Sequence, residues 1–435
     1  MHPTTPTQTP ARPGTKSHGV NESTGPLERK TIKVYMMELW SFIPYYIASL
    51  CANLRDESVE VIQGSARYHL DRDYFRKTGL TPDTALLDFG GAIRSARLRR
   101  FVKAFEYIAN LFGLAIRFAA FRPDVLHVQY LPFLEQGFPF EIWFMRWVRL
   151  LGVRVVYTVH NVTPQDAPDR YKHRYLSAYQ ATDALICHGN EARSQLIQDF
   201  SIPSEQIWVI PHGPLFAEKP DLSPEEARAK LGLRVEQLLV LCLGVISQYK
   251  GILFLLDAWR RLVEEGTRAK LLIGGTGDPN LLSEIREKVT ADGIGTSVDL
   301  WLRFISVEEL PLLYQAADIL VYPYKAGTTS GALLTGLSYG KAVVATTLPF
   351  FEEHLNHGKD AALVEYGDVN GLAEALAELI HDPVKRGRYG RSIMEGRSRR
   401  GSWRSIARAT VDCYQAVCRF TPPKQVRREA PNHST

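Results

Sequence analysis

The sequence predicts an α/β protein built from two doubly wound domains, each formed around a parallel sheet. Short apolar runs alternate with amphipathic helical patterns along most of the 435 residues, as expected for parallel strands joined by crossover helices. The runs number twelve, which is more than a single open sheet usually holds. After the sixth run, a segment at 211–221 with several prolines interrupts the alternation. We therefore expect two sheets with an interdomain linker at 211–221.

Each predicted strand is an apolar run bounded by polar or turn residues. In the first half these runs are 32–36, 59–63, 125–129, 153–159, 184–187 and 208–210. In the second half they are 238–243, 269–273, 298–302, 319–322, 342–345 and 362–364. The first domain then spans 30–214 and the second 215–401. The segment 1–29 is rich in Thr and Pro, so it is predicted to be a disordered tail, as is 419–435.

Composition excludes several classes of protein. A net charge of +5 on a chain of this size gives no overall signal for nucleic acid. The five cysteines are scattered and form no CxxC pair, which favours a reducing compartment over disulfides or zinc. No export signal and no apolar stretch of roughly 18 residues is found. We expect a cytoplasmic protein.

A loop late in the chain is suited to phosphate. The segment 317–346 reads as strand, loop, short helix, Gly stop and strand. Its loop, Gly327-Thr328-Thr329-Ser330-Gly331, places hydroxyls and free backbone N–H groups at a helix N-terminus. The helix dipole leaves about half a positive charge there, which attracts anions. This arrangement points towards a nucleotide-diphosphate substrate.

Two further glycine-rich loops follow strands of the same domain. In LCLGVISQYKG, Gly244 allows close backbone approach and Lys250 could neutralise a diphosphate; an ordinary βα turn with a surface lysine explains the segment equally well. The second loop, LLIGGTGDPN at 271–280, lacks the GxGxxG spacing of dinucleotide-binding proteins. Together the three loops are predicted to share one edge of the sheet, where ligands bind in such folds.

Candidate residues in the first domain also follow strands. His160 comes directly after the strand at 153–159, which places it at the predicted cleft. His127 and Gln129 end the neighbouring strand, where a structural role is the stronger interpretation. The segment Asp71-Arg72-Asp73 sits in a polar stretch and is interpreted as a solvated loop. No other acidic or histidine cluster has metal-ligand spacing, so we expect no metal.

The segment 94–122 combines positive charge with apolar residues at helical spacing. Cations at a helix start oppose the helix dipole, so they do not serve helix stability. An anionic membrane surface would attract them, although a solvated face over a core helix explains them equally well. The basic residues are Arg94, Arg97, Arg99, Arg100 and Lys103, and the apolar ones, predicted to be mostly core, are Phe101, Phe105, Ile108, Leu111, Phe112 and Phe118. The segment 138–154 adds Trp143, Phe144, Arg146, Trp147 and Arg149.

Taken in order, several motifs resemble those of the family 4 retaining glycosyltransferases. The resemblance covers roughly residues 30–418. In the first half it rests on Asp124-Val-Leu-His127, Tyr157-Thr-Val-His160-Asn161 and Val209-Ile-Pro-His212-Gly213. In the second half it rests on Tyr249-Lys250-Gly251, Ile273-Gly-Gly275, Arg303-Phe304-Ile305, Ala316-Ala-Asp318, Tyr322-Pro-Tyr324, Thr329-Ser330-Gly331 and Gly340-Lys341. Gly401-Ser-Trp403 through Tyr414 resembles the family's closing helix, at 402–418, which completes the first domain.

The resemblance implies a GT-B fold, with two Rossmann-like domains facing across a cleft. It implies that Lys250 meets the donor diphosphate and that the backbone of Arg303, Phe304 and Ile305 lies near the base. It places His160 near the sugar and reaction centre, as a catalytic residue together with Lys250, and His127 and Asn161 near the acceptor. The remaining donor-binding residues that it implies are Gly244, Ser247, Gly275, Thr328, Thr329, Ser330, Gly331 and Thr335.

The chain departs from the family pattern in the phosphate loop. Many members carry two glutamates eight residues apart, at positions that correspond to Gly327 and Thr335 here. Many also carry an arginine beside Lys250, where this chain has Val245 and Ser247. Lys250 is therefore the one obvious cation of that loop.

The leading hypothesis is a metal-independent, retaining glycosyltransferase of the hexosyltransferase type. Its donor would be a UDP- or GDP-sugar, with no other cofactor. Its acceptor would be a lipid-linked or polysaccharide precursor. The protein would bind peripherally to the inner face of the cell membrane, attracted by anionic lipids. A nucleotide-sugar epimerase on a similar fold would need a set of carboxylates that the sequence does not reveal. A catalytically degenerate GT-B domain that binds a glycan or a partner protein is the alternative outside enzymology.

Overall fold

The computed structural model describes residues 31–57, 59–66, 71, 74–93, 95–163, 168–216, 218–396 and 401–419. Ile32–Thr435 forms one compact unit. The predicted tail at 1–29 lies outside the described residues, as do Arg72, Asp73 and Arg94. The tail predicted at 419–435 also lies outside them, except for Arg419, which ends the last helix.

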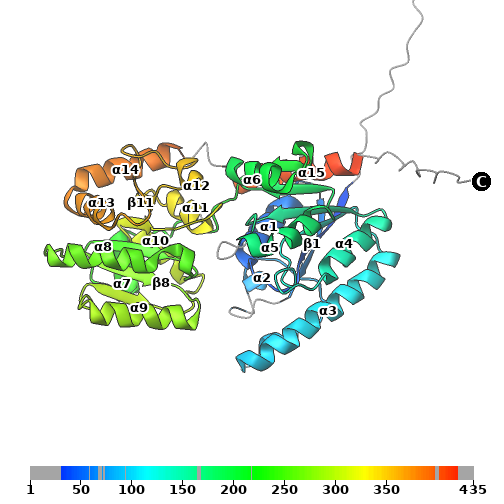
Figure 1. The fold of residues 1–435 in the computed structure, drawn as a ribbon, viewed down its shortest axis with the longest axis horizontal. Helices are drawn as coiled ribbons and strands as arrows, with labels where there is room; N and C mark the ends of the chain where they lie inside the picture. Colours follow the sequence, from blue (N-terminus) through cyan, green and yellow to red (C-terminus); the bar gives the residue numbers. More distant parts are fainter. Residues whose placement is uncertain are drawn as a thin grey trace, which may run out of the picture. The chain divides into compact units, whose positions relative to one another are not determined.

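Two six-stranded, wholly parallel sheets organise the chain (Figure 1). The first holds β1 (Ile32–Glu38), β2 (Val59–Ser65), β3 (Val125–Val128), β4 (Arg154–Val159), β5 (Ala184–Cys187) and β6 (Ile207–Val209). The second holds β7 (Leu239–Leu243), β8 (Lys270–Gly274), β9 (Val298–Trp301), β10 (Ile319–Tyr322), β11 (Ala342–Thr346) and β12 (Ala361–Val364). All twelve predicted strands are present, which confirms the predicted fold class.

Helices connect the strands and follow the last strand of each sheet. Those of the first half are α1 (Pro44–Arg55), α2 (Tyr74–Lys77), η1 (Gly90–Ala92), α3 (Ala96–Ala120), α4 (Phe140–Leu150), α5 (Pro168–Tyr179), α6 (Asn190–Phe200) and η2 (Ser204–Gln206). Those of the second half are α7 (Pro224–Lys230), η3 (Gln248–Lys250), α8 (Ile252–Glu264), α9 (Pro279–Ala291), α10 (Glu309–Ala316), α11 (Gly331–Ser338), α12 (Pro349–Glu352), α13 (Val369–His381) and α14 (Pro383–Glu395), followed by α15 (Trp403–Arg419).

The strand orders locate the ligand-binding edge of each sheet. They are β2-β1-β3-β4-β5-β6 and β12-β11-β10-β7-β8-β9. In the first sheet the order reverses between β1 and β3, and in the second it reverses between β7 and β10. In open α/β sheets ligands bind outside the carboxyl ends of the strands at this switch point. The loops after β1, β3, β7 and β10 are therefore the places to look for function.

The last helix returns to the first sheet. Figure 1 shows α15, in red, among the helices of the first half. Buried residues of α15 share a hydrophobic cluster with buried residues of α1 and of five strands of the first sheet. Between β6 and α7 the described residues form neither helix nor strand. The residue at which one domain ends and the next begins stays a prediction.

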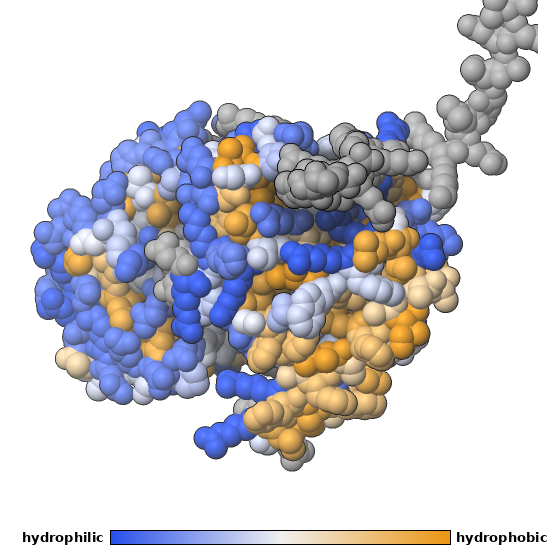
Figure 2. Space-filling model, turned by 45° about the vertical axis from the view of Figure 1, so that its right-hand side comes forward, coloured by the Kyte–Doolittle hydropathy of each residue, from blue (hydrophilic) through white to orange (hydrophobic). Residues whose placement is uncertain are grey.

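Helix α3 is only partly buried, which corrects the expectation that its apolar residues are mostly core. Leu111 and Phe118 are buried against the first sheet, but Phe101, Phe105 and Phe112 are between 69% and 77% exposed. The helix has apolar residues on two sides, and one side faces solvent (Figure 2). Among the described residues, no helix is long and apolar enough to cross a membrane.

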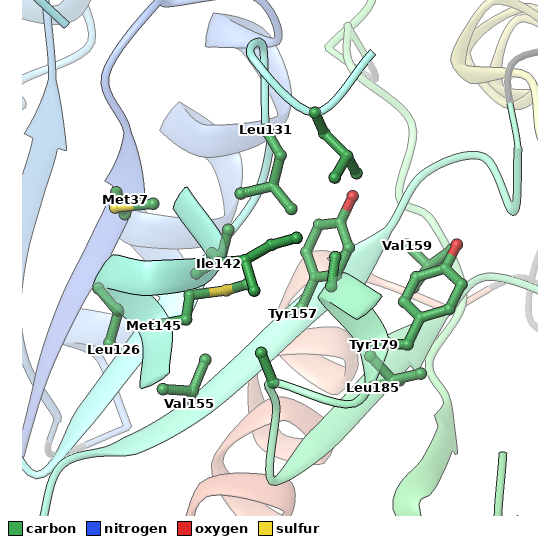
Figure 3. Packing of buried hydrophobic residues seen from close by; sticks show 14 of the residues in the cluster. Met37, Leu126, Leu131, Ile142, Met145, Val155, Tyr157, Val159, Tyr179 and Leu185 are labelled. Carbon is green, nitrogen blue, oxygen red and sulfur yellow. The ribbon is translucent and has the colours of Figure 1, made fainter. Parts of the chain in front are cut away.

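Each sheet is covered by helices on both faces. Alternate residues of β1 enter different cores: Tyr35 and Met37 pack in one, while Val34 and Met36 pack in the other. Figure 3 shows part of the first core, where Met145 of α4 packs near strand residues such as Leu126. The second sheet divides in the same way between two clusters. Burial on both faces explains why strands such as β5 and β10 read as continuous apolar runs.

Candidate functional site

A pocket of about 380 Å³ lies at the carboxyl ends of strands from both sheets. This volume falls within the range of small-molecule sites. The second half supplies residues after β7, β8 and β10, and the first half supplies residues after β1, β4 and β6. The pocket therefore adjoins the switch point of each sheet, as the topology predicts. Among the described residues that line it, none is Asp or Glu.

Two loops of the second half meet so closely that only glycine fits between them. Gly275, after β8, has φ of 145°, and a Cβ atom there would lie 1.8 Å from the carbonyl oxygen of Gly244. Gly244 follows β7 and donates its N–H to Gly274. Both Gly244 and Gly275 line the pocket, and their assignment to a donor site stays a prediction. This part of the wall is backbone, so a ligand can approach the main chain directly.

Lys250 provides the positive charge of this wall. It ends the short helix η3, and its Nζ lies 3.8 Å from the ring centroid of Tyr324 and 5.1 Å from that of Tyr249. The surrounding protein desolvates the ammonium and lowers its pKa to about 7. No described residue forms an ion pair or a hydrogen bond with its side chain. The aromatic faces therefore hold the ammonium while leaving its N–H donors available to a ligand.

The N-terminus of α11 faces the same pocket. Ser330 is the N-cap, and its hydroxyl accepts the backbone N–H of Leu333 at 3.1 Å. The hydroxyl of Tyr324 lies 3.3 Å from the same oxygen. The neighbouring Thr329 lines the pocket, and its buried hydroxyl has no partner among the described residues. Thr329, Ser330 and Gly331 thus bring unused donors to one wall, as the sequence predicted.

Some predicted donor residues lie elsewhere or have other partners. Ser247, Thr328 and Arg303 are not among the pocket-lining residues, whereas Phe304 and Ile305 are. Arg303 binds Glu309 through both guanidinium nitrogens, at 2.9 and 2.6 Å, and lowers the pKa of that carboxyl to about 2. Its side chain is thus engaged outside the pocket.

Thr335 lines the pocket but uses its hydroxyl to support the chain. That oxygen accepts the backbone N–H of Leu215 at 3.0 Å. Leu215 belongs to the segment between the two sheets. At the position where many relatives carry a glutamate, this chain therefore has a hydrogen bond that joins the segment to α11.

On the opposite wall, His160 belongs to a hydrogen-bonded chain of side chains. It follows β4 and lines the pocket together with Asn161. Its Nδ1 lies 3.2 Å from Nε2 of His188, whose Nδ1 lies 3.0 Å from the carbonyl oxygen of Ile210. Because a carbonyl only accepts, we assign the proton of His188 to Nδ1. Neutral His188 then accepts from Nδ1–H of His160, which leaves Nε2 of His160 as an acceptor.

The chain continues behind His160 through Gln129. The amide of Gln129 lies 3.1 Å from Nε2 of His160 and 3.0 Å from Nε2 of His127. Nδ1 of His127 lies 2.6 Å from the hydroxyl of Tyr414, on α15. In the structure the amide oxygen of Gln129 faces Nε2 of His160, and its NH₂ group faces His127 and the sulfur of Met36. The two ends of an amide are assigned from the hydrogen-bond network, and we infer the exchanged orientation, in which the NH₂ group donates to Nε2 of His160. Both ring nitrogens of His160 are therefore occupied within the protein.

The imidazoles of this wall are neutral at pH 7. Burial lowers the pKa of His127 to about 3, that of His188 to about 4 and that of His212 to about 3. Burial, followed by the neighbouring His188, also lowers the pKa of His160 well below its usual range. His127 is fully buried and does not line the pocket, so it reaches the site through hydrogen-bond partners such as Gln129 and Thr158.

Sequence reasoning missed several residues of the first-half wall. His212 follows β6 and packs against the ring of Tyr46, which in turn packs edge-on against His160. Phe42, after β1, is 61% exposed in the pocket and stacks on Tyr130. The strand-end argument that located His160 also applies to these loops, so a search of every strand end would have found them.

Comparison with known proteins assigns the two halves of the chain. A family model described as Glycosyltransferase Family 4 matches residues 43–213, and one described as Glycosyl transferases group 1 matches residues 237–382. The chain belongs to glycosyltransferase family 4. It is thus a glycosyltransferase, and the resemblance seen in its motifs is confirmed.

Individual relatives of this glycosyltransferase are distant. D-inositol 3-phosphate glycosyltransferase of Corynebacterium efficiens is 24% identical, over 67% of this chain and 70% of that protein. Alpha-monoglucosyldiacylglycerol synthase of Streptococcus pneumoniae is 28% identical, over 49% of this chain and 48% of that protein. The crystal structure of Anabaena Alr3699/HepE in complex with UDP and glucose has a TM-score of 0.71 at 15% identity, covering 88% of this chain and 100% of that one. These matches establish a GT-B fold.

Among its described lining residues, the pocket of this family 4 enzyme offers one cation, backbone amides and hydroxyls on one side and neutral polar groups on the other. A diphosphate would find an ammonium, a helix N-terminus and no lining carboxylate to repel it. The position of Gly327, where many relatives carry a glutamate, has φ of 150° and does not line the pocket. Within the described residues, no group of three or more His, Cys, Asp or Glu could hold a metal ion.

Proposed function

We propose that this glycosyltransferase transfers a sugar from a UDP- or GDP-linked donor to an acceptor hydroxyl, with retention of anomeric configuration. The observation that carries the proposal is the position of Lys250 beside the N-terminus of α11, at the switch point of the second sheet. Alr3699/HepE, which shares the fold, has been crystallised with UDP and glucose, which supports a nucleotide-sugar donor here.

The residues of the second half stabilise the leaving group. When the bond between the sugar carbon and the diphosphate oxygen breaks, negative charge grows on the diphosphate. The ammonium of Lys250 and the backbone N–H groups at Ser330 and Gly331 are already oriented towards that charge, and preorganised donors of this kind lower the barrier. The cation also binds the ground state, so it contributes to both affinity and rate.

The first half orients the sugar without removing a proton. Because both ring nitrogens of His160 are occupied, the imidazole has no free nitrogen to act as a base. In a retaining reaction without an enzyme nucleophile, the acceptor hydroxyl attacks on the face that the diphosphate leaves. The new bond joins the acceptor oxygen to the sugar carbon, and the acceptor proton passes to an oxygen of the departing phosphate. None of the described residues that line the pocket is Asp or Glu, which is consistent with this route.

The acceptor is a lipid-linked or polysaccharide-precursor hydroxyl. One relative is named a D-inositol 3-phosphate glycosyltransferase, and another is named a synthase of alpha-monoglucosyldiacylglycerol. The pocket wall on the acceptor side is aromatic, with Phe42, Tyr45 and Tyr46 among its residues. Such a wall suits an amphipathic acceptor or a sugar ring better than a highly charged one.

A nucleoside diphosphate panel tests the donor assignment. We expect UDP or GDP to raise the melting temperature of the full chain by a few degrees, since a ligand that binds only the folded state stabilises it by mass action. The corresponding monophosphate should have a smaller effect because it lacks the second phosphate. If neither diphosphate stabilises the protein beyond its monophosphate, the donor assignment fails.

Turnover and stereochemistry test the reaction. With the stabilising nucleotide, the matching sugar donors should release free nucleoside diphosphate when extracted lipid acceptors are added, and proton NMR of the product should show the donor's anomeric configuration. An inverted product would refute retention. An epimerase would instead change the donor sugar without releasing the nucleotide, and a binding protein would do neither.

A further inference from the structure

An apolar ridge runs along the solvent side of α3. Its members are spaced three or four residues apart, so they form one stripe on the helix. They are Leu98, Phe101, Phe105, Ile108, Phe112 and Ile116, all exposed. Phe101 is 77% exposed and Phe112 is 70% exposed, although the opposite side of the same helix is buried against the first sheet. About five turns of exposed aromatic and aliphatic residues are far more than the scattered apolar residues of an ordinary surface.

The ridge continues onto the helix beside it. Phe138, Trp143 and Leu150, in and just before α4, are 47%, 59% and 86% exposed. Buried residues of α3 and α4 lie in one core cluster, so the two helices form a joined outer layer. Figure 2 shows hydrophobic residues gathered over this part of the first half, with hydrophilic side chains at one end of α3. We call these exposed residues of α3 and α4 the α3–α4 face.

The exposed charges of α3 and α4 have a single sign. Arg97, Arg100 and Arg146 are exposed on the two helices. The acidic residues of α3 and α4 are Glu106 and Glu141, and both are buried. Glu106 accepts backbone N–H groups of the η1 turn, and Glu141 accepts that of Phe133. The α3–α4 face therefore presents arginines and large apolar side chains, with no exposed carboxylate on either helix.

This combination selects one kind of occupant. An anionic lipid bilayer takes apolar side chains at the level of its headgroups and attracts arginines beside them. A second copy of the chain fits less well, because a symmetric contact would bring the same arginines together with no exposed carboxylate of α3 or α4 to pair them. Trp143 adds an aromatic ring of the type that is enriched at membrane interfaces.

We propose that the α3–α4 face docks this glycosyltransferase onto an anionic membrane surface. The proposal rests on the proposed function, because docking would bring a lipid-linked acceptor to the enzyme. The loop after β1 connects the two sites: Trp40 packs against Tyr107 of α3, with ring centroids 5.9 Å apart, and Phe42, two residues later, lines the pocket. The inner side of α3 therefore contacts the loop that supplies part of the acceptor wall.

Vesicle flotation with the full chain tests the proposal. Wild-type protein should bind vesicles that contain phosphatidylglycerol, bind pure phosphatidylcholine vesicles weakly, and lose affinity as salt rises. The triple variant Phe101→Ser/Phe105→Ser/Phe112→Ser should reduce the partition coefficient about tenfold or more. The double variant Arg97→Gln/Arg100→Gln should weaken binding at low salt and have less effect at high salt. Val384→Ser, at a 77% exposed site on α14, is the matched control and should leave binding unchanged.

Two readouts separate this proposal from the proposed function and from self-association. Nucleoside diphosphate binding in the absence of vesicles should be the same in the triple variant as in wild type. The donor assignment can therefore be wrong without contradicting the docking proposal. Brominated lipids should quench part of the tryptophan fluorescence of the wild-type protein. That quenched part should be missing in Trp143→Phe. If the triple variant floats as well as wild type, or if sedimentation shows a dimer that the triple variant abolishes while vesicles are ignored, the docking proposal is overturned.

Discussion

Lys250 and His160 line one pocket from opposite walls, and their side chains have different hydrogen-bond environments. Both are desolvated, which lowers the pKa of each. Lys250 is held only by the faces of two aromatic rings, whereas His160 is hydrogen-bonded at both ring nitrogens. The N–H donors of Lys250 are therefore available to a ligand, whereas the ring nitrogens of His160 are hydrogen-bonded to other residues of the protein. Desolvation alone therefore does not identify a group that does chemistry; its unused hydrogen-bonding capacity does.

The same contrast extends to the two halves of the enzyme. The second half builds its wall from glycine backbone, a helix N-terminus and one cation, which are features suited to a diphosphate. The first half builds its wall from aromatic rings and neutral imidazoles, and carries the α3–α4 face on its outside. If this division is real, substitutions on the two walls should separate donor binding from acceptor positioning.

The largest effect is expected at the donor wall. Lys250→Met should lower donor turnover by about 10²–10³-fold, the range seen when one preorganised donor to a developing negative charge is removed. Nucleoside diphosphate affinity should fall as well. Lys325→Met, at an exposed lysine after β10, is the matched control and should retain the wild-type rate. Wild-type turnover in Lys250→Met would contradict the proposal that Lys250 stabilises the donor diphosphate.

A smaller effect on stability is expected where the two halves are joined. Thr335→Val keeps the shape of the side chain but leaves the N–H of Leu215 without its acceptor, which should cost about 1 kcal/mol of unfolding free energy. Denaturant melts measure this change. Because we assign the hydroxyl to structure, nucleoside diphosphate affinity should stay within about twofold of wild type. A loss of affinity without a loss of stability would show that Thr335 binds ligand instead.

The acceptor wall should respond through positioning. Gln129→Leu removes the partner of Nε2 of His160 without touching the pocket lining, and we expect kcat to fall about tenfold while donor affinity holds. A double-mutant cycle with His160→Ala checks the mechanism. The effects of the two substitutions on kcat should be strongly non-additive, because each one removes the oriented imidazole of His160. Additive losses would mean that Gln129 acts elsewhere.

The smallest expected effect concerns stability and pH. The pKa of Lys250 is lowered from 10.5 to about 7 in the folded chain. Between these values the unfolded chain binds a proton that the folded chain does not, so the cost of burying this lysine is full below pH 7 and declines as pH rises towards 10.5. Because the half-buried ammonium keeps part of its hydration, we expect Lys250→Met to stabilise the protein by about 1 kcal/mol at pH 6. The gain should shrink by pH 9, as chemical denaturation at the two pH values will show.

Sequence predicted the strands well because both faces of each sheet are buried. Runs such as 319–322 and 184–187 are wholly apolar and match β10 and β5 residue for residue. The donor loops could be located for a related reason, since the carboxyl ends of parallel strands share one edge. Gly244, Lys250, Gly275 and the Thr329–Gly331 segment needed only that topological argument.

Sequence could not predict how individual side chains are used. Helix α3 has apolar residues on two sides, and periodicity does not say which side meets the sheet, so Phe101 and Phe112 were expected in the core. The chain from Tyr414 to His160 joins residues nearly 300 positions apart, and no local pattern marks it. The tie between Thr335 and Leu215 depends in the same way on where α11 meets the segment that precedes it.

Calorimetric titration of the full chain with UDP or GDP at pH 8, in buffers of different ionisation enthalpy, tests the central claim most directly. At this pH a terminal phosphate, whose second pKa is about 6, is already ionised. Lys250, with its pKa near 7, is mostly neutral. Binding a diphosphate beside it should raise that pKa, so we predict uptake of roughly 0.5–0.9 proton per ligand. The uptake should persist in Lys325→Met and vanish in Lys250→Met. Tight binding without proton uptake, or the same uptake in Lys250→Met, would contradict the claim that Lys250 receives the diphosphate.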